Sequence, residues 1–447
     1  MGRVALIGDN SIGYVNALLE IWNHSDCAVL IDWRIPFETA VDMMKEADVK
    51  KCYIETGLYP KITDAALSAV LFERYEKLNL KAELLPASIY DKFRENYSKA
   101  EAVVIYSSGT TGKSKGIILS HYAINTNADA IIDYMNPISD DCIYICKTLS
   151  HSSTLVGELL VALKTKTKLI VAPVIVPPRY VLNNIEKCGV TILCVNPSLL
   201  SLYVDSYNPS KFNLSTLKTI YVSGSIMNDK VYTKAHESFS DISIYNVYGL
   251  SEAGPRVTAQ TKDSNKSNSV GKPIKGVQIQ IVDEQGKPLP HGERGILHVF
   301  TQSQFNGYIV GLQKNPSLYK TWLNTGDIGY VDNDEELHIV GRSDDVIIID
   351  SHKIYPIDIE RILMDQTTVK ECAIAKIDID NYECLGCLYV GTIKNDFEMN
   401  KILRNKLMAY EVPRYFVQCG RLPKNINGKV MINEVISYII KHIINRN

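Results

Sequence analysis

Short apolar runs alternate with amphipathic stretches through the first half of the chain. Residues 12–22, for example, place Val15, Leu18 and Trp22 on one helical face directly after an apolar run. Apolar runs of strand length, most of them followed by a helical pattern, occupy residues 4–7, 28–32, 168–172, 190–194 and 219–223. Strands that alternate with helices at this spacing predict an α/β fold with parallel, doubly wound sheets.

The pattern changes near residue 270. Short strand-like runs, separated by turns that contain Gly and Asp, follow at residues 277–282, 295–299 and 336–340. They are typical of a small β-rich unit. A mixed helix and strand pattern begins after Gly341–Asp345. Because 447 residues exceed the roughly 250–300 that share one core, we expect a large body over 1–341 and a small α+β domain over 346–447.

The last residues carry an apolar stripe at helical spacing, at Val435, Ile436, Ile439, Ile440, Ile443 and Ile444. We expect this helix to pack onto the last domain. A partner-binding or membrane-surface helix is the alternative, but Lys441, His442 and Arg446 give it few basic residues.

The charge balance argues against polyanionic partners. The chain has 48 Lys and Arg against 50 Asp and Glu, a formal net charge of −2, so nothing global favours nucleic acid or an anionic membrane. No apolar run reaches the ~18 residues of a membrane span, and the first residues lack the apolar core of a secretion signal. We therefore expect a cytoplasmic protein.

The 10 cysteines follow no disulfide framework. Cys384 and Cys387 form a CxxC, but they lie among alternating small and apolar residues, which indicates a buried strand rather than a metal or redox site. Cys142 and Cys146 are interpreted in the same way.

Residues 103–119 form the most informative segment. Its turn holds glycines at Gly109, Gly112 and Gly116, hydroxyls at Ser107, Ser108, Thr110 and Thr111, and cations at Lys113 and Lys115. Glycines let backbone N–H groups approach an anion, while hydroxyls add donors and lysines add charge, so we predict a phosphate-binding loop. It is not a Walker A loop, because Ser107 replaces the first glycine and a strand-like run follows.

The sequence from Tyr106 to Gly116 resembles the signature loop of the adenylate-forming superfamily, which includes acyl-CoA and aryl-CoA synthetases, nonribosomal peptide synthetase adenylation domains and luciferases. The resemblance continues in order through Tyr248–Glu252, Thr325–Asp327, Gly341–Asp344 and Pro423–Lys429. It implies that a carboxylate attacks the α-phosphorus of ATP, giving an acyl-adenylate and pyrophosphate, and that a thiol then displaces AMP.

The resemblance also implies which residues bind ATP. The 107–116 loop would hold the β- and γ-phosphates, with Lys115 as the family's lysine. Glu252 would ligate Mg²⁺, and Asp327 would bind the ribose hydroxyls. Tyr248 would pack on adenine, Asn246 would bind its amino edge, and Ser251 would lie near the α-phosphate. The remaining contacts would come from Gly224, Ser225, Gly249 and Arg342.

Two further residues would act through the small domain. Asp344 matches the hinge, residues 342–345, about which this domain rotates between the two half-reactions. Lys429 matches the lysine that bridges the substrate carboxylate and the α-phosphate during adenylation and then moves away.

The acid is expected to carry no amino group, because relatives that activate amino acids have an Asp in the segment corresponding to Thr148–Thr154 and none occurs here. An aryl acid is favoured, with a fatty or short-chain acid or an amino acid as alternatives. The substrate pocket would include His151, Ser152, Asn196, Ser223 and Gly249.

The acceptor would be CoA or the phosphopantetheine of a carrier protein; Asp350–His352 stand where thioester-forming relatives usually have Gly-Gly or Gly-His. Relatives usually carry a further N-terminal segment, and its shortening would expose a surface for a homodimer. The rival classes are a P-loop kinase, disfavoured by the Walker mismatch, and an inactive nucleotide-binding relative, which should have lost Glu252, Asp327 or Lys429.

Overall fold

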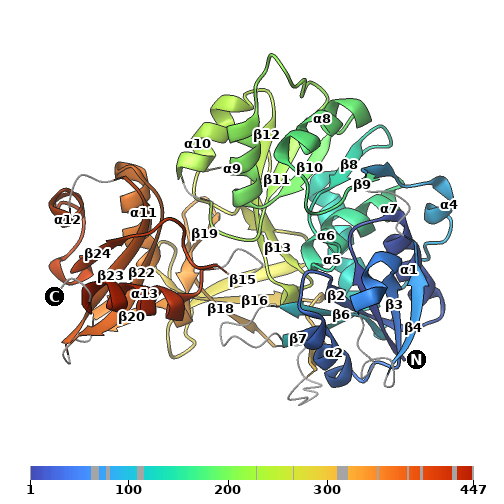
Figure 1. Ribbon diagram of the computed structural model, residues 1–447, viewed down its shortest axis with the longest axis horizontal. Coiled ribbons are helices and arrows are strands. Elements are labelled where there is room, and N and C mark those ends of the chain that lie inside the picture. The colour runs from blue at the N-terminus through green and yellow to red at the C-terminus, as the bar shows by residue number, and fades with distance from the viewer. Residues whose placement is uncertain are drawn as a thin grey trace.

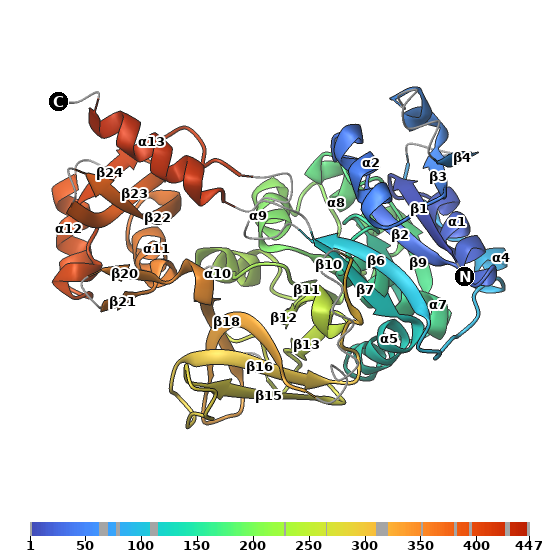
Figure 2. The same ribbon diagram turned by 90° about the horizontal axis from the view of Figure 1, so that it is seen from below.

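The computed structural model describes residues 2–61, 70–76, 81–107, 115–227, 229–264, 266–309, 321–349, 352–379, 382–392, 396–424 and 430–444. Figure 1 shows a large body built from the blue to yellow segments and a small orange and red unit beside it. Figure 2 shows the β-rich part, around β15, β16 and β18, on one side of the body. This architecture confirms the predicted α/β fold class with a small C-terminal unit; the boundary at residues 341–346 stays a prediction.

The first sheet of the body has the strand order β17-β7-β6-β2-β1-β3-β4. Its strands are β1 (Arg3–Gly8), β2 (Cys27–Asp32), β3 (Lys51–Glu55), β4 (Leu71–Tyr75), β6 (Glu101–Ser107), β7 (Lys115–Ser120) and β17 (Gly307–Tyr308). The pairs from β6 to β4 are parallel, as predicted, whereas β7 and β17 are antiparallel additions at one edge.

The second sheet has the order β14-β13-β12-β11-β10-β8-β9-β5. Its strands are β5 (Glu83–Leu84), β8 (Cys142–Ile145), β9 (Lys168–Val171), β10 (Ile192–Val195), β11 (Thr219–Val222), β12 (Ser243–Gly249), β13 (Arg256–Ala259) and β14 (Lys272–Pro273). Its central strands are parallel, and both edges are closed by antiparallel strands.

Helices fill the space between the two sheets and cover their outer faces. The main helices of the body are α1 (Ile12–Asn23), α2 (Phe37–Glu46), α4 (Ala87–Tyr90), α5 (His121–Met135), α6 (Ser152–Thr154), α7 (Val161–Thr165), α8 (Pro178–Cys188), α9 (Pro197–Ser206) and α10 (Asp229–Ser238), with a π-helical segment η2 (Leu155–Leu160) between α6 and α7. The largest apolar cluster joins α1, α5 and η2 to both sheets. α2 covers the other face of the first sheet, and α8 to α10 cover the second.

Local sequence signals fix several helix ends. The Ser11 and Ser120 side chains accept hydrogen bonds from the backbone N–H groups of Tyr14 and Ala123, which caps the first turns of α1 and α5. α8 ends at Gly189, whose φ of 64° lies in the left-handed region that glycine adopts without strain. Within the described ranges, no helix combines the length and the apolar character needed to cross a membrane.

The β-rich unit is a four-stranded sheet of order β15-β16-β18-β19, from β15 (Val277–Val282), β16 (Gly295–Thr301), β18 (Leu323–Val331) and β19 (Leu337–Arg342). The small unit contains β20 (Ile347–Ile349), β21 (His352–Ile354), α11 (Pro356–Gln366), β22 (Val369–Ile379), β23 (Tyr382–Gly391), α12 (Asp396–Arg404), β24 (Tyr415–Gln418) and α13 (Ile432–Ile444). α11 and α12 cover one face of the β22-β23-β24 sheet, and α13 covers the other.

Two predictions made from the apolar pattern are confirmed in the small unit. Val435 and Ile439 of α13 are fully buried against the sheet, so most of the apolar stripe packs onto the domain, while Ile444 stays exposed. Cys384 and Cys387 lie buried within β23.

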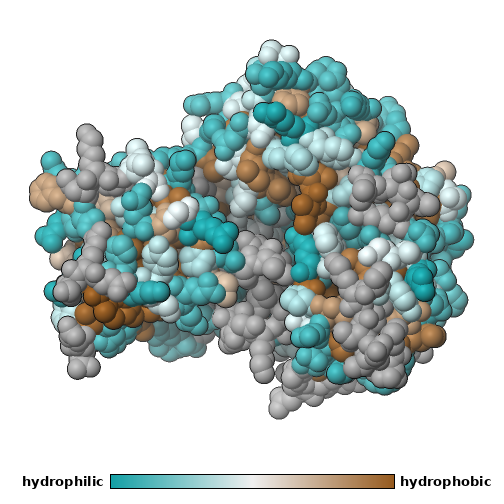
Figure 3. Space-filling view, viewed as in Figure 1, coloured by the Kyte–Doolittle hydropathy of each residue, from teal (hydrophilic) through white to brown (hydrophobic). Residues whose placement is uncertain are grey.

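Polar contacts join the small unit to the body. Arg294 Nη1 lies 2.6 Å from Asp358 Oδ2, and Lys230 Nζ donates to the Thr367 carbonyl over 2.7 Å. Lys353 forms a third contact, with Glu284. Figure 3 shows the face of the molecule that is seen in Figure 1. On this face, hydrophobic residues form small groups between hydrophilic ones on both units.

Candidate nucleotide and acid site

The predicted phosphate loop connects two antiparallel strands, β6 and β7, in which Ser107 pairs with Lys115. Lys115 is exposed, and its Nζ lies 5.4 Å from the centre of the Tyr308 ring. At Gly116 an added Cβ would lie 2.7 Å from Ile309 Cγ1, so the strand tolerates no side chain there. Seven predicted site residues lie outside the described residues, at Ser108, Gly109, Thr110, Thr111, Gly112, Lys113 and Lys429.

Tyr308 connects the loop to the predicted metal ligand. Its hydroxyl donates to Glu252 Oε1 over 3.0 Å while its ring faces Lys115. Burial, and then the neighbouring Glu252 charge, raise the pKa of Tyr308, so the phenol stays protonated and donates. Tyr308 was not predicted as a site residue, because it lies on the two-residue strand β17, outside every recognised motif.

Asp327 is the centre of a second polar group. The hydroxyl of Tyr248 donates to Asp327 Oδ2, and Arg342 Nη1 donates to Asp327 Oδ1 over 3.0 Å and to the Thr325 carbonyl over 2.9 Å. The antiparallel register of β18 and β19 sets Asp327 directly opposite Arg342. Burial raises the pKa of Asp327, although both partners favour the charged form. Two residues predicted from separate motifs, Tyr248 and Arg342, therefore meet at the carboxylate of a third, Asp327.

A short turn after β12 presents Ser251 and Glu252. The turn is closed by a hydrogen bond of 2.9 Å from the Leu250 N–H to the Pro255 carbonyl. Gly249 is packed so closely that an added Cβ would lie 2.0 Å from the Pro255 oxygen. Ser251 Oγ lies 2.8 Å from Ser152 Oγ, which places the turn beside the predicted substrate segment.

Residues predicted around adenine, and two residues of the predicted substrate pocket, come from the ends of three parallel strands. Asn246, in β12, is buried, and its Nδ2 donates to the Ser269 carbonyl over 3.2 Å, which leaves Oδ1 as the acceptor side of the amide. Ser223 follows β11, and Gly224 adopts a φ of 102°. Asn196 caps α9 by accepting from the Leu199 N–H, and its Cβ is 3.8 Å from where a Gly224 Cβ would lie.

His151 precedes α6 as its N-cap residue and lies near an ion pair of Asp32 with Arg34, whose Nε is 2.9 Å from Asp32 Oδ1. Burial lowers the pKa of His151 more than the Asp32 charge raises it. The imidazole is therefore neutral near pH 7 and offers one donor and one acceptor.

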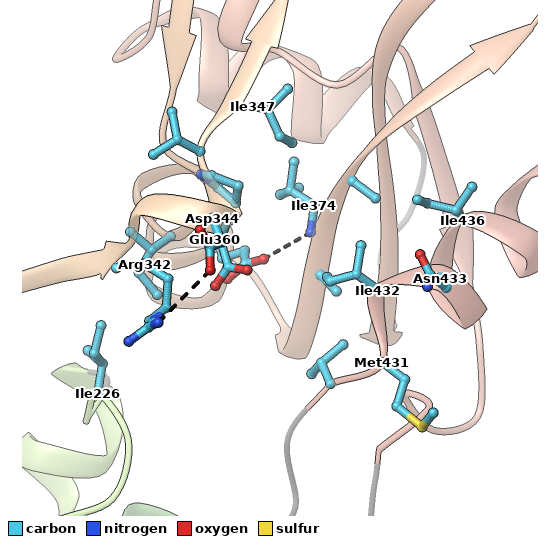
Figure 4. A pocket seen from close by; sticks show the side chains of 18 of the residues that line it. Ile226, Arg342, Asp344, Ile347, Glu360, Ile374, Met431, Ile432, Asn433 and Ile436 are labelled. Carbon is cyan, nitrogen blue, oxygen red and sulfur yellow. Dashed lines mark hydrogen bonds and ion pairs between the residues drawn. The ribbon is translucent and has the colours of Figure 1, made fainter. Parts of the chain in front are cut away.

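A groove of about 1350 Å³ separates the body from the small unit, and His151, Arg342 and Asp344 all line it. Figure 4 shows Arg342 extending toward Ile226 of the body, whereas Asp344 and Glu360 lie on the side of the small unit. Three of the predicted site residues, one from the substrate segment and two from the hinge region, thus open onto the surface that the small unit faces.

The donor set around Glu252 fits Mg²⁺. This ion is usually held by one or two carboxylates together with substrate phosphates, and Glu252 keeps a second oxygen beside the one that Tyr308 binds. Within the described ranges there is no group of three or more His, Cys, Asp or Glu arranged to hold a metal without such help.

The chain was compared with known proteins. The sequence profile described as AMP-binding enzyme matches residues 2–309. A 2-succinylbenzoate–CoA ligase of Lactococcus lactis subsp. lactis is 25% identical over 438 residues, which cover 97% of this chain and 90% of the relative. A 4-coumarate–CoA ligase of Narcissus pseudonarcissus is 26% identical over 74% of this chain and 63% of its own length.

Solved structures share the fold. ATP-bound MatB from Rhodopseudomonas palustris superposes with a TM-score of 0.86 at 21% identity, covering 98% of this chain and 88% of that one. The match to residues 2–309 covers most of the chain and contains the loop, the Tyr248–Glu252 turn and both central sheets. The resemblance found in the sequence is confirmed: the chain belongs to the AMP-binding enzyme family, within the adenylate-forming superfamily.

Proposed function

We propose that the protein activates a carboxylic acid with ATP, giving an acyl-adenylate and pyrophosphate, and then transfers the acyl group to a thiol. The observation that carries the proposal is that Tyr248 and Arg342 both donate to the Asp327 carboxylate, with Arg342 also lining the groove. The buried carboxylate of Asp327 can accept hydrogen bonds from ribose hydroxyls. The neighbouring ring of Tyr248 can pack against adenine.

Cationic and hydrogen-bond-donating residues bind the phosphates of ATP, whereas a carboxylate binds its ribose. Lys115 and the loop neutralise the β- and γ-phosphates, and Ser251 donates to the α-phosphate. Asp327 accepts the ribose hydroxyls, while Arg342 favours the charged form of that carboxylate against the effect of burial. The bonds inside this group fix Asp327 before ATP arrives, which reduces the ordering needed on binding.

Glu252 is the residue that holds Mg²⁺, and the ion supplies positive charge beside the phosphates when it is bound. Tyr308 orients this carboxylate through its 3.0 Å hydrogen bond. Lys429 completes the adenylation site from the small unit, and Asp344, exposed beside the groove, provides the hinge. The domain division at residues 342–345 belongs to the same proposal.

The substrate pocket is formed by His151, Ser152, Asn196, Ser223 and Gly249. The relatives from Lactococcus and Narcissus are named for 2-succinylbenzoate and 4-coumarate, both aryl acids, and this supports an aryl acid here. Their names also support CoA as the acceptor. A carrier protein is the alternative acceptor, and a homodimer remains part of the proposal.

We also propose that the enzyme works in the cytoplasm, where its substrate ATP is abundant.

Pyrophosphate exchange into ATP tests the first half-reaction. A panel of aryl, fatty and amino acids should give exchange with at least one acid in the presence of Mg²⁺. Lys429→Ala should abolish exchange yet largely spare thioester formation from supplied acyl-AMP, because its role is confined to adenylation. No exchange with any acid would favour an inactive nucleotide-binding relative, and equal loss of both half-reactions would refute the role of Lys429.

A further inference from the structure

Three ionisable side chains are buried together between the two sheets of the body. Lys147 follows β8, Glu158 lies in η2, and Arg256 begins β13. Glu158 is 1% exposed and Arg256 4%, while the Lys147 side chain keeps 12%. We call these three residues the buried charge cluster.

The cluster has more positive than negative charge. Lys147 Nζ lies 3.0 Å from Glu158 Oε1, but among the described residues Arg256 has no acidic partner within ion-pair distance. Burial lowers the pKa of Lys147, but the charge of Glu158, the hydrogen bond to it and the nearby Cys194 and Cys146 together outweigh burial, so the pKa is raised and the ammonium keeps its proton. Two cations face one carboxylate, and a buried net positive charge is costly unless another anion balances it.

Polar atoms in and around the cluster also lack partners. Within the described part of the chain, no hydrogen bond reaches Arg256 Nε, Glu158 Oε2 or Thr154 Oγ1, although all three atoms are buried. Thr154 lies one helical turn before Glu158. Tyr134 faces Arg256, whose charge lowers the pKa of a phenol that burial raises. Buried polar groups are nearly always paired. The unpartnered atoms of Arg256, Glu158 and Thr154 therefore indicate together a site for a polar ligand.

The cluster adjoins the predicted substrate pocket. Arg256 Nη2 is 3.2 Å from the position that a Gly157 Cβ would take, so the guanidinium occupies the space that this glycine leaves. Gly157 is five residues after Ser152, on the helical segment that Ser152 begins. Ser251, five residues before Arg256, is hydrogen-bonded to Ser152.

The second sheet places the cluster below the same pocket. The charges of Glu158, Lys147 and Arg256 all act on the Cys194 thiol, which lies in β10 two residues before Asn196. Arg256 also acts on Tyr221, in β11 two residues before Ser223. The cluster therefore lies beside the strands β10 and β11, whose ends are followed by the pocket residues Asn196 and Ser223.

We infer that the acid activated by this protein carries a second anionic group, a carboxylate in the simplest case, which binds to Arg256 and Lys147 at the inner end of the pocket. The inference rests on the proposed function and specifies its substrate class as dicarboxylic acids. A guanidinium binds a carboxylate through two parallel hydrogen bonds, and the added negative charge neutralises the cluster. An acid with one carboxylate leaves the excess charge unbalanced.

Pyrophosphate exchange tests this with pairs of acids that have the same length and shape. Aromatic and aliphatic dicarboxylic acids are each compared with their half-amides. We expect the best dicarboxylic acid to exceed its half-amide by at least about 100-fold in kcat/KM. Arg256→Met should reduce this ratio about 100-fold, and Arg256→Lys, which keeps the charge without the fork, should reduce it less.

Two further variants distinguish a loss of substrate recognition from a loss of folding. Glu158→Gln preserves the shape of the site but removes its negative charge, so the ratio should rise. Lys164→Met is the matched control, because the Lys164 side chain is 4% exposed and forms ion pairs with Asp129 and Glu95 away from the cluster. Its ratio should stay within about twofold of the wild type.

The outcomes are separable. Exchange with monocarboxylic acids at equal or higher kcat/KM than with every dicarboxylic acid overturns the inference but leaves the proposed function standing. A ratio that Arg256→Met, Arg256→Lys and Glu158→Gln all leave unchanged also overturns it, since the cluster is then a structural ion group. Absence of exchange with any acid refutes the proposed function, and the inference with it.

Discussion

Replacement of Glu360 by Gln should change how the stability of the small unit depends on pH. Glu360 lies on α11 and lines the groove, and its Oε1 accepts a hydrogen bond of 2.9 Å from the Ile374 N–H (Figure 4). Burial raises the pKa of Glu360 to about 7, with a smaller contribution from the nearby charge of Asp345. Gln keeps a carbonyl oxygen for Ile374 but does not titrate.

The sign follows from proton binding. In the unfolded chain Glu360 loses its proton near its ordinary pKa of 4.5, whereas in the folded protein it keeps it up to about pH 7. Between these values the folded state binds the extra proton, so the free energy of unfolding falls as pH rises. A shift of this size corresponds to about 3 kcal/mol at most. Because part of the side chain is exposed in the groove, we expect about 1–3 kcal/mol.

Urea unfolding followed by far-UV circular dichroism measures this effect. Fluorescence is unsuitable, because Trp22, Trp33 and Trp322 all lie outside the small unit. The wild type and Glu360→Gln are compared at about pH 5 and about pH 8. The wild type should lose about 1–3 kcal/mol more than the variant between the two conditions. Parallel pH profiles, or a smaller loss in the wild type, would refute the reasoning.

Three further predictions concern the nucleotide site. Gly249→Ala places a Cβ 2.0 Å from the Pro255 oxygen, so it should cost about 1–3 kcal/mol in urea unfolding and reduce exchange more than tenfold; wild-type exchange would contradict the assigned turn. Tyr308→Phe removes the hydrogen bond to Glu252 and should raise the Mg²⁺ concentration for half-maximal exchange several-fold without changing the KM for the acid. Asp327→Asn should raise the KM for ATP about 10- to 100-fold, and an equal rise in the KM for the acid would argue against ribose binding.

Much of the fold is predictable from local patterns. The apolar runs at 4–7, 28–32 and 219–223 correspond to β1, β2 and β11, because buried parallel strands appear as continuous apolar runs. The strand-like run after the phosphate loop corresponds to β7, but the antiparallel pairing at the sheet edges was not predicted. β17 has only two residues, Gly307 and Tyr308, and nothing so short produces a periodic signal.

The candidate site was predictable only where motifs existed. Tyr248, Asp327 and Arg342 lie in three separate motifs, and the structure brings them together, although their roles stay predictions. The sequence around Arg256 and Glu158 did not predict a site, since each is an isolated charged residue that belongs to no motif. Only the packing of η2 against β13 shows that they share one buried space.

The contacts that hold the small unit against the body have a practical consequence. Lys230, Arg294 and Lys353 bridge the two parts through partly exposed polar groups, and such pairs each contribute about 0–1 kcal/mol. Salt screens them over a distance of about 8 Å at physiological ionic strength. The distribution of domain orientations should therefore shift with added salt, so rates for the two half-reactions are comparable only at a common ionic strength.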